Sequence, residues 1–103
     1  MTVYELIKDA IQHKKIITAD FKGFYREMCP HHLGTKNGKY NCLFYQFGGF
    51  SSSGLSSDPF KNWRCIPIDL LQNVQVIEGN WHTAGNHTRP STCIDDTHFI
   101  VDF

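Results

Sequence analysis

Apolar positions at the start of the chain repeat with the period of a helix. They fall at the i, i+3, i+4, i+7 and i+8 spacing of one amphipathic stripe, at Val3, Leu6, Ile7, Ala10 and Ile11. Thr2, with Glu5 three residues later, matches a capping box, in which each side chain binds an amide of the first turn. Lys14 and Lys15 suit the negative end of the helix dipole. The pattern predicts a helix over residues 3–14.

After residue 15 the period changes to the alternation of strands. "IITADF" and "FYREMCP" predict a hairpin that turns at Lys22 and Gly23, and Asn37-Gly38 predicts a second turn that leads into the strand "YNCLFYQF". "WRCIPI", "VQVIE" and "HFIVDF" are expected to form three more strands, with one helical turn at "DLLQN". The chain should therefore be a mainly β protein with one N-terminal helix.

One helix followed by five or six strands fits a single domain over residues 1–103. We expect residues 16–103 to form a small, partly open barrel of the Sm-like or SH3-like kind. A meander sheet with the helix on one face is the alternative architecture. A chain of 103 residues is long enough to bury one core.

Two long polar segments interrupt these strands, at residues 48–62 and 79–97. They are rich in Gly, Ser, Thr, His and Asn, and long loops in compact domains are often functional. In a small barrel such loops can meet at one rim and build a concave polar and aromatic site. The alternative is that they are solvated connections without chemistry.

Composition and charge limit the classes of function. Hydrophobic residues make up 41% of the chain and charged residues 19%, as in globular proteins, and ten Lys and Arg offset ten Asp and Glu. A formal charge of zero makes nucleic-acid binding less favoured, although a local basic patch would still permit it. No apolar run is long enough to span a membrane, and the N-terminal segment lacks the features of a signal peptide.

These features predict a cytoplasmic protein whose four cysteines are reduced thiols. Cys42 and Cys65 lie within apolar runs, where we expect them to be small core residues.

Residues 16–78 resemble the WYL domain, a bacterial Sm-like regulatory module. "ITADFKGFYREMCPHHLGTKNGKYNCLFYQF" fits its first part and "WRCIPIDLLQNVQV" is similar to its second, although Tyr40-Asn41-Cys42 stands where the family has Trp-Tyr-Leu, and Leu70 replaces its usual arginine. The resemblance implies a module that senses small ligands, often nucleotides or short nucleic acids. Relatives usually adjoin a DNA-binding domain, which this chain is too short to contain, so regulation would require a protein partner.

The leading hypothesis from the residues is a non-enzymatic module that binds a small anionic or aromatic ligand, with a nucleotide as the best guess. Arg26 and Arg64 would bind the anion. Tyr45 and Trp81 would stack on a ring, while Ser52 in "GGFSSSG" would offer hydroxyl and amide donors. Further hydrogen bonds would come from His31, His82 and His87. In the plainer interpretation, the arginines pair with surface acids and Tyr45 packs in the core.

Three alternatives belong to other classes. Zinc as a cofactor would stabilise an interaction module through Cys29, His82, His87 and Cys93, which are all competent ligands at an irregular spacing. In the second alternative the protein is an enzyme, with Cys29 or Cys93 as a nucleophile that is activated by His82 or His87. The third alternative binds single-stranded nucleic acid. An exposed edge strand would also permit a homodimer.

Overall fold

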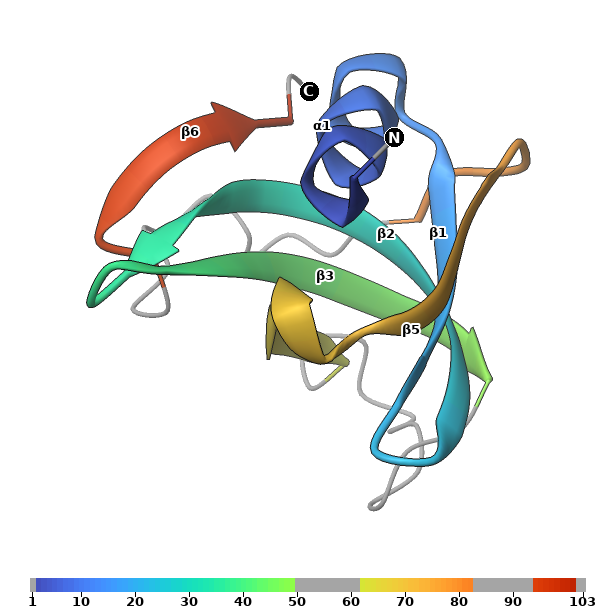
Figure 1. The fold of residues 1–103 in the computed structure, drawn as a ribbon. Coiled ribbons are helices and arrows are strands. Elements are labelled where there is room, and N and C mark those ends of the chain that lie inside the picture. The colour runs from blue at the N-terminus through green and yellow to red at the C-terminus, as the bar shows by residue number, and fades with distance from the viewer. Residues whose placement is uncertain (1, 50–61, 83–93, 102–103) are drawn as a thin grey trace.

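The computed structural model describes residues 2–49, 62–82 and 94–101 (Figure 1). Its elements follow the order α1 (Val3–His13), β1 (Ile16–Phe21), β2 (Phe24–Lys36), β3 (Lys39–Gly49), β4 (Trp63–Pro67), the 3₁₀ turn η2 (Ile68–Leu70), β5 (Gln72–Ile77) and β6 (Asp96–Ile100). Ser52, His87 and Cys93 lie outside the described residues, and so does most of each predicted loop.

The helix begins and ends at the predicted signals. The Thr2 hydroxyl accepts a hydrogen bond from the Glu5 amide, and the Glu5 carboxylate accepts one from the Thr2 amide, which completes the capping box. Lys14 closes the helix in the left-handed conformation, and its amide donates to the carbonyl of Ala10. The apolar stripe buries Ile7, Ala10 and Ile11 against the sheet.

All strand pairs are antiparallel, and the sheet follows the order β4-β3-β2-β1-β5, with β6 paired to β2. Lys22–Gly23 and Asn37–Gly38 each have two successive positive φ angles, the geometry of tight hairpin turns. Within the described residues no ladder joins β4 to β5, so the bent sheet is not closed. The mainly β fold with one N-terminal helix is confirmed, while the narrower likeness to Sm-like or SH3-like barrels stays a prediction.

β2 is the longest strand and contacts three others. Its first half pairs with β1, its last part pairs with β6, and β3 accompanies it along most of its length. The strand was expected to end at Pro30, but it continues to Lys36. His31 makes this continuation irregular, because the register with β3 steps from Pro30 opposite Phe44 to His32 opposite Leu43. His31 is thus the extra residue of a bulge.

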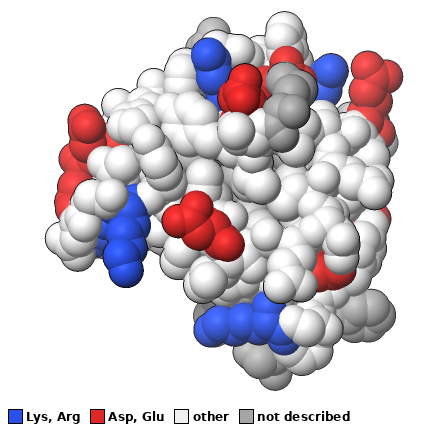
Figure 2. All heavy atoms as spheres, in the orientation of Figure 1, with Lys and Arg blue, Asp and Glu red and all other residues white. Residues whose placement is uncertain are grey.

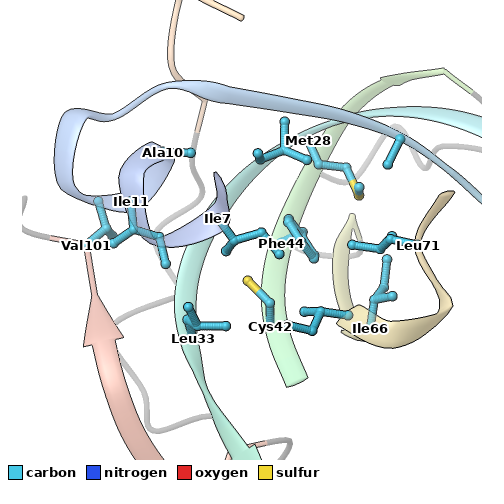
Figure 3. Packing of buried hydrophobic residues seen from close by; sticks show 13 residues of the cluster. Ile7, Ala10, Ile11, Met28, Leu33, Cys42, Phe44, Ile66, Leu71 and Val101 are labelled. Carbon is cyan, nitrogen blue, oxygen red and sulfur yellow. The ribbon is translucent and has the colours of Figure 1, made fainter. Parts of the chain in front are cut away.

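The core lies between α1 and the concave side of the sheet (Figure 3). Figure 3 shows Ile7 pointing at Phe44, with Leu33 and Cys42 below and Met28 above them. Ile66 of β4 and Leu71, the residue after η2, close the core at one side. Cys42 is a buried core residue as expected, with the pKa of its thiol strongly raised by burial.

Two predictions about Cys65 are wrong. The Cys65 side chain is exposed on β4 and does not pack in the core. Neighbouring side chains of a strand point to opposite faces, and on β4 the Ile66 side chain is the one that points into the core. Cys65 is also disulfide-bonded and not a reduced thiol, whereas Cys29 and Cys42 are free.

Candidate functional site

Arg26 lies at the end of the core, on the same side of the sheet as the apolar residues. It stands opposite Ala19 of β1, and side chains directly opposite one another share a face. Only 3% of its surface is exposed. Gly49 is its partner on β3, where an added Cβ would come within 2.7 Å of the Arg26 Cα. The absence of a side chain at Gly49 is what lets β2 and β3 stay paired beside the buried arginine.

The Arg26 guanidinium has polar and aromatic neighbours. One terminal nitrogen donates a hydrogen bond of 3.2 Å to the side-chain oxygen of Gln46 on β3, whose amide nitrogen donates in turn to the Gly48 carbonyl at 3.1 Å. The centre of the guanidinium lies 5.0 Å from the Phe21 ring centroid, within the range of a cation–π interaction. Arg26 is therefore held in place by an amide and a ring.

A second arginine stands close to the first. Arg64 of β4 pairs with Phe44, a core residue, so it lies on the same face of the sheet as Arg26. Burial lowers the pKa of the Arg26 guanidinium, and the positive charge of Arg64 lowers it further. We call Phe21, Arg26, Gln46 and Arg64 the arginine site.

No acid balances Arg26 within the described residues. Its ion-pair and hydrogen-bond partners there include no Asp or Glu, and its Nε has no acceptor in the described part of the chain. A buried charge is costly unless an opposite charge or a full set of hydrogen bonds compensates it. Among the described residues, the charge of Arg26 thus has no opposite charge beside it.

The predicted aromatic residues gather on the opposite face of the sheet. Tyr45 stands opposite Cys29 on β2 and Trp63 on β4. The bulge directs His31 into the same region, where its ring stacks on Trp81 at 4.4 Å and meets the edge of Trp63 at 4.6 Å. Trp63 also contacts Tyr45, at 5.1 Å between ring centroids. We call His31, Tyr45, Trp63 and Trp81 the aromatic cluster.

The aromatic cluster is packed rather than open. His31 is fully buried, and its Nδ1 donates to the Cys29 carbonyl at 2.8 Å, which leaves the proton on that nitrogen since a carbonyl only accepts. Tyr45 is 7% exposed. The His31 and Trp81 rings are stacked, and the other two ring contacts are edge-to-face, so the four rings pack on one another.

His82 begins to cover the same outer face. Its ring stacks on Phe47 at 4.2 Å, and its backbone N–H donates to the Cys29 sulfur at 3.2 Å. The end of β3 and the start of the predicted 79–97 loop therefore meet here. Burial raises the pKa of the Cys29 thiol to about 11, so this thiol is not an activated nucleophile at neutral pH.

The predicted site residues thus form two groups within the described part of the chain. Arg26 and Arg64 lie together on the core side, while His31, Tyr45 and His82 lie on the outer side. Trp81 stacks on His31 and also packs against the core. Gln46 and Phe21 complete the arginine site and were not predicted. A polar Gln inside the apolar run "CLFYQF" is the signal that could have identified Gln46, since a buried amide requires partners.

The zinc alternative finds no further support among the described residues, where no three His, Cys, Asp or Glu side chains come together. Cys29 and His82 meet through a backbone N–H rather than through the imidazole. His87 and Cys93 lie outside the described residues. Zinc binding stays a prediction.

Comparison with known proteins gave no match, either among family models, among curated proteins or among solved structures. In the described residues, no helix has the length and apolar character needed to cross a lipid bilayer.

Proposed function

We propose that the protein is a non-enzymatic binding module for a small anionic ligand, with the anion held between Arg26 and Arg64. One observation carries the proposal. Arg26 is a buried guanidinium with a second arginine beside it and no acid to balance it in the described residues. An anion at this position would supply the opposite charge that the described residues do not provide.

The chemistry of the site favours a planar or tetrahedral anion. Guanidinium groups bind carboxylates and phosphates through paired N–H donors, and the Arg26 Nε supplies such a donor. Arg64 is only partly buried, and so it offers the approach to the site. The resemblance of residues 16–78 to WYL modules adds a nucleotide as the candidate ligand.

Isothermal titration calorimetry with inorganic phosphate, AMP and ATP tests the proposal. Wild type should bind at least one of these anions, and Arg64→Ala should abolish that binding. A charge-assisted hydrogen bond contributes about 1.5–3 kcal/mol, equivalent to roughly 10- to 100-fold in Kd. The melting temperature of Arg64→Ala should stay close to that of wild type, because this side chain is not part of the apolar core.

Lys39→Ala is the matched control. It removes one positive charge at the exposed β2–β3 turn and leaves the arginine site intact, so its affinity for the same anion should equal that of wild type. If both variants bind the anion equally weakly, the loss of affinity comes from the change in net charge and not from the arginine site. A large fall in the melting temperature of Arg64→Ala would make Arg64 a structural residue.

Arg26→Met separates binding from folding. Methionine keeps the length and apolar contacts of the side chain but removes the uncompensated charge. The variant should be as stable as wild type or more stable, yet fail to bind the anion. If it unfolds instead, the charge of Arg26 stabilises the fold itself and the anion site is wrong.

A further inference from the structure

A groove lies where the start of α1, the start of β3 and η2 meet. Its volume is about 540 Å³, within the range of small-molecule sites in proteins. Apolar, aromatic and acidic side chains of these elements line it, among them Val3, Tyr4, Tyr40, Ile68, Asp69 and Leu71. None of these residues belongs to the arginine site, so the groove is a separate candidate for a ligand.

The two tyrosines of the groove are held in place by their neighbours. Tyr40 is 43% exposed, yet its ring packs on that of Tyr4, with the centroids 5.1 Å apart and the planes at 60°. The Tyr4 hydroxyl is hydrogen-bonded to Nδ1 of His98 at 2.8 Å, and the His98 ring meets the Tyr40 ring edge-on at 6.0 Å. Rings that are fixed before a ligand arrives lose little conformational freedom when it binds.

A bulge in β6 supplies the histidine behind these rings. Leu33 of β2 stands opposite Phe99 of β6. The next residue of β2, Gly34, stands opposite Thr97, so the register skips His98. Bulges re-aim a side chain, and this one turns the His98 ring toward Tyr4. The fold thus contains a specific device that fixes the Tyr4 ring beside the groove.

The groove has a negative charge. Among the described residues that line it, Asp69 alone is charged. Its side chain is exposed and forms no ion pair with a described Lys or Arg. Figure 2 shows an acidic group over η2 and largely uncharged atoms between it and the start of α1. The faces of aromatic rings also attract cations, so Asp69 and the tyrosines favour the same sign of ligand charge.

The positive groups near the groove are neutralised or directed elsewhere. The positive end of the α1 dipole borders the groove, but the Glu5 carboxylate binds there. Hydrogen bonds from Thr2 lower the pKa of Glu5, and the charges of the N-terminus and Lys8 lower it further. The Lys8 ammonium lies over an aromatic ring of β6, at 5.1 Å from its centroid. Lys39 precedes Tyr40 on β3 and so points to the opposite face of the sheet.

The hydrogen-bond acceptors of the groove favour an alkylated ammonium over a primary one. A primary ammonium carries three N–H donors that need acceptors. The Thr2 hydroxyl is engaged with Glu5, and the Tyr4 hydroxyl is engaged with His98. An alkylated ammonium has fewer N–H donors or none, and its carbon substituents suit apolar walls such as Leu71.

We infer that this groove binds a small alkylated ammonium ion. The ammonium contacts the Tyr40 ring and the Asp69 carboxylate, and its carbon substituents pack on Ile68 and Leu71. This site takes a cation, whereas the arginine site takes an anion, and the two share no residue. Either site can therefore fail its test without affecting the other.

Choline and 3,3-dimethylbutan-1-ol are the probes, because they have nearly the same shape and differ by one positive charge. Each would be titrated into the ¹⁵N-labelled full chain at constant ionic strength and followed by heteronuclear NMR. Choline should shift the amide signals of Tyr4, Tyr40 and Leu71 in a saturable way, and the neutral alcohol should bind about fivefold more weakly. Asp69→Asn and Tyr40→Leu should each weaken choline binding about threefold, the scale of one exposed contact with a cation.

Tyr25→Leu and Glu78→Gln are the matched controls. Tyr25 is 45% exposed, nearly as much as Tyr40, Glu78 is an exposed acid, and neither lines the groove. Both controls should bind choline as wild type does. The inference is overturned if choline gives no saturable shifts, if the shifts lie away from the groove, or if the controls weaken binding as much as the groove variants. Equal binding of the neutral alcohol to wild type would also overturn it, and this comparison needs no variant to fold.

Discussion

At the scale of the residue, buried polar groups define what is unusual in this protein. Arg26, Gln46 and His31 are all almost fully buried, and they come from the neighbouring strands β2 and β3. Gln46 receives and donates a side-chain hydrogen bond, and His31 donates one. Of these three side chains, the guanidinium of Arg26 is the one with a donor that has no acceptor in the described residues. This difference is why the proposal is placed on Arg26 and not on the histidine.

Gly34 is a residue whose replacement should act at a distance. An added Cβ would collide with the Asp96 carbonyl and lie 2.7 Å from Cγ2 of Ile94, so β6 could no longer approach β2. Gly34→Ala should lower the free energy of unfolding by about 1–3 kcal/mol, the usual cost of overpacking. Denaturant unfolding would measure this loss.

Gly38→Ala is the control for Gly34→Ala. Its φ of +79° also penalises a side chain, by about 1–2 kcal/mol, but an added Cβ would meet no atom within 4 Å. Hydrogen exchange should therefore show loss of protection in β6 for Gly34→Ala alone. Equal protection of β6 in the two variants would contradict the predicted collision.

At the scale of the element, local signals predicted local structure. The capping box predicted α1, and the Lys-Gly and Asn-Gly pairs predicted both hairpin turns, because a cap or a tight turn depends on a few adjacent residues. The full length of β2 was not predicted. Pro30, His31 and His32 suggest a break, yet all three are buried in the strand, which β6 covers from His32 onward. That covering comes from residues more than 60 positions away.

The turn between β2 and β3 should make stability depend on pH. Asp95 accepts a hydrogen bond of 3.1 Å from the Asn37 amide and pairs with Lys36 at 3.3 Å. These donors lower the pKa of Asp95 in the folded state. Stability from this carboxylate is therefore present above the pKa of an unfolded aspartate, about 4, and is lost as the pH falls through the lower folded value.

Asp95→Asn tests this dependence. The variant should be less stable than wild type at pH 7, and the difference should vanish at a pH below both values. Urea denaturation across this range would measure it, and 1 M salt should reduce the part that comes from the exposed Lys36 pair. A difference that is the same at low and neutral pH would show that the asparagine disturbs the turn for another reason.

At the scale of the whole molecule, the arrangement of the site could not be read from the sequence. Arg26, Arg64, His31 and the aromatic residues were identified from their type and position, but their separation onto two faces depends on strand register. The register is set by pairing along β2, including the bulge at His31, and no local pattern specifies it. For the same reason Phe21 and Gln46 were missed, since they reach Arg26 from different strands.

The cysteines allow one test of the whole chain. In denaturant without reductant, two thiols should react with Ellman's reagent, those of Cys29 and Cys42, and after reduction all four should react. In the native state neither free thiol should react quickly at pH 7, because both are buried and burial raises their pKa values.

Four reactive thiols before reduction would show that the Cys65 disulfide does not form. That result would favour the predicted cytoplasmic location, because disulfides rarely persist in reducing compartments. Two reactive thiols would favour an oxidising compartment instead.

The bulge at His31 has a consequence for how this chain can vary in length. Side chains along a strand alternate between faces, and the register with β3 skips His31, since Pro30 stands opposite Phe44 and His32 opposite Leu43. Deletion of His31 would therefore leave a regular ladder, with Leu33 still in the core and Gly34 still where β6 needs empty space. What would be lost is the contact of the His31 ring with Trp63 and Trp81. In related chains, a gap of one residue in this strand should therefore fall at the bulge.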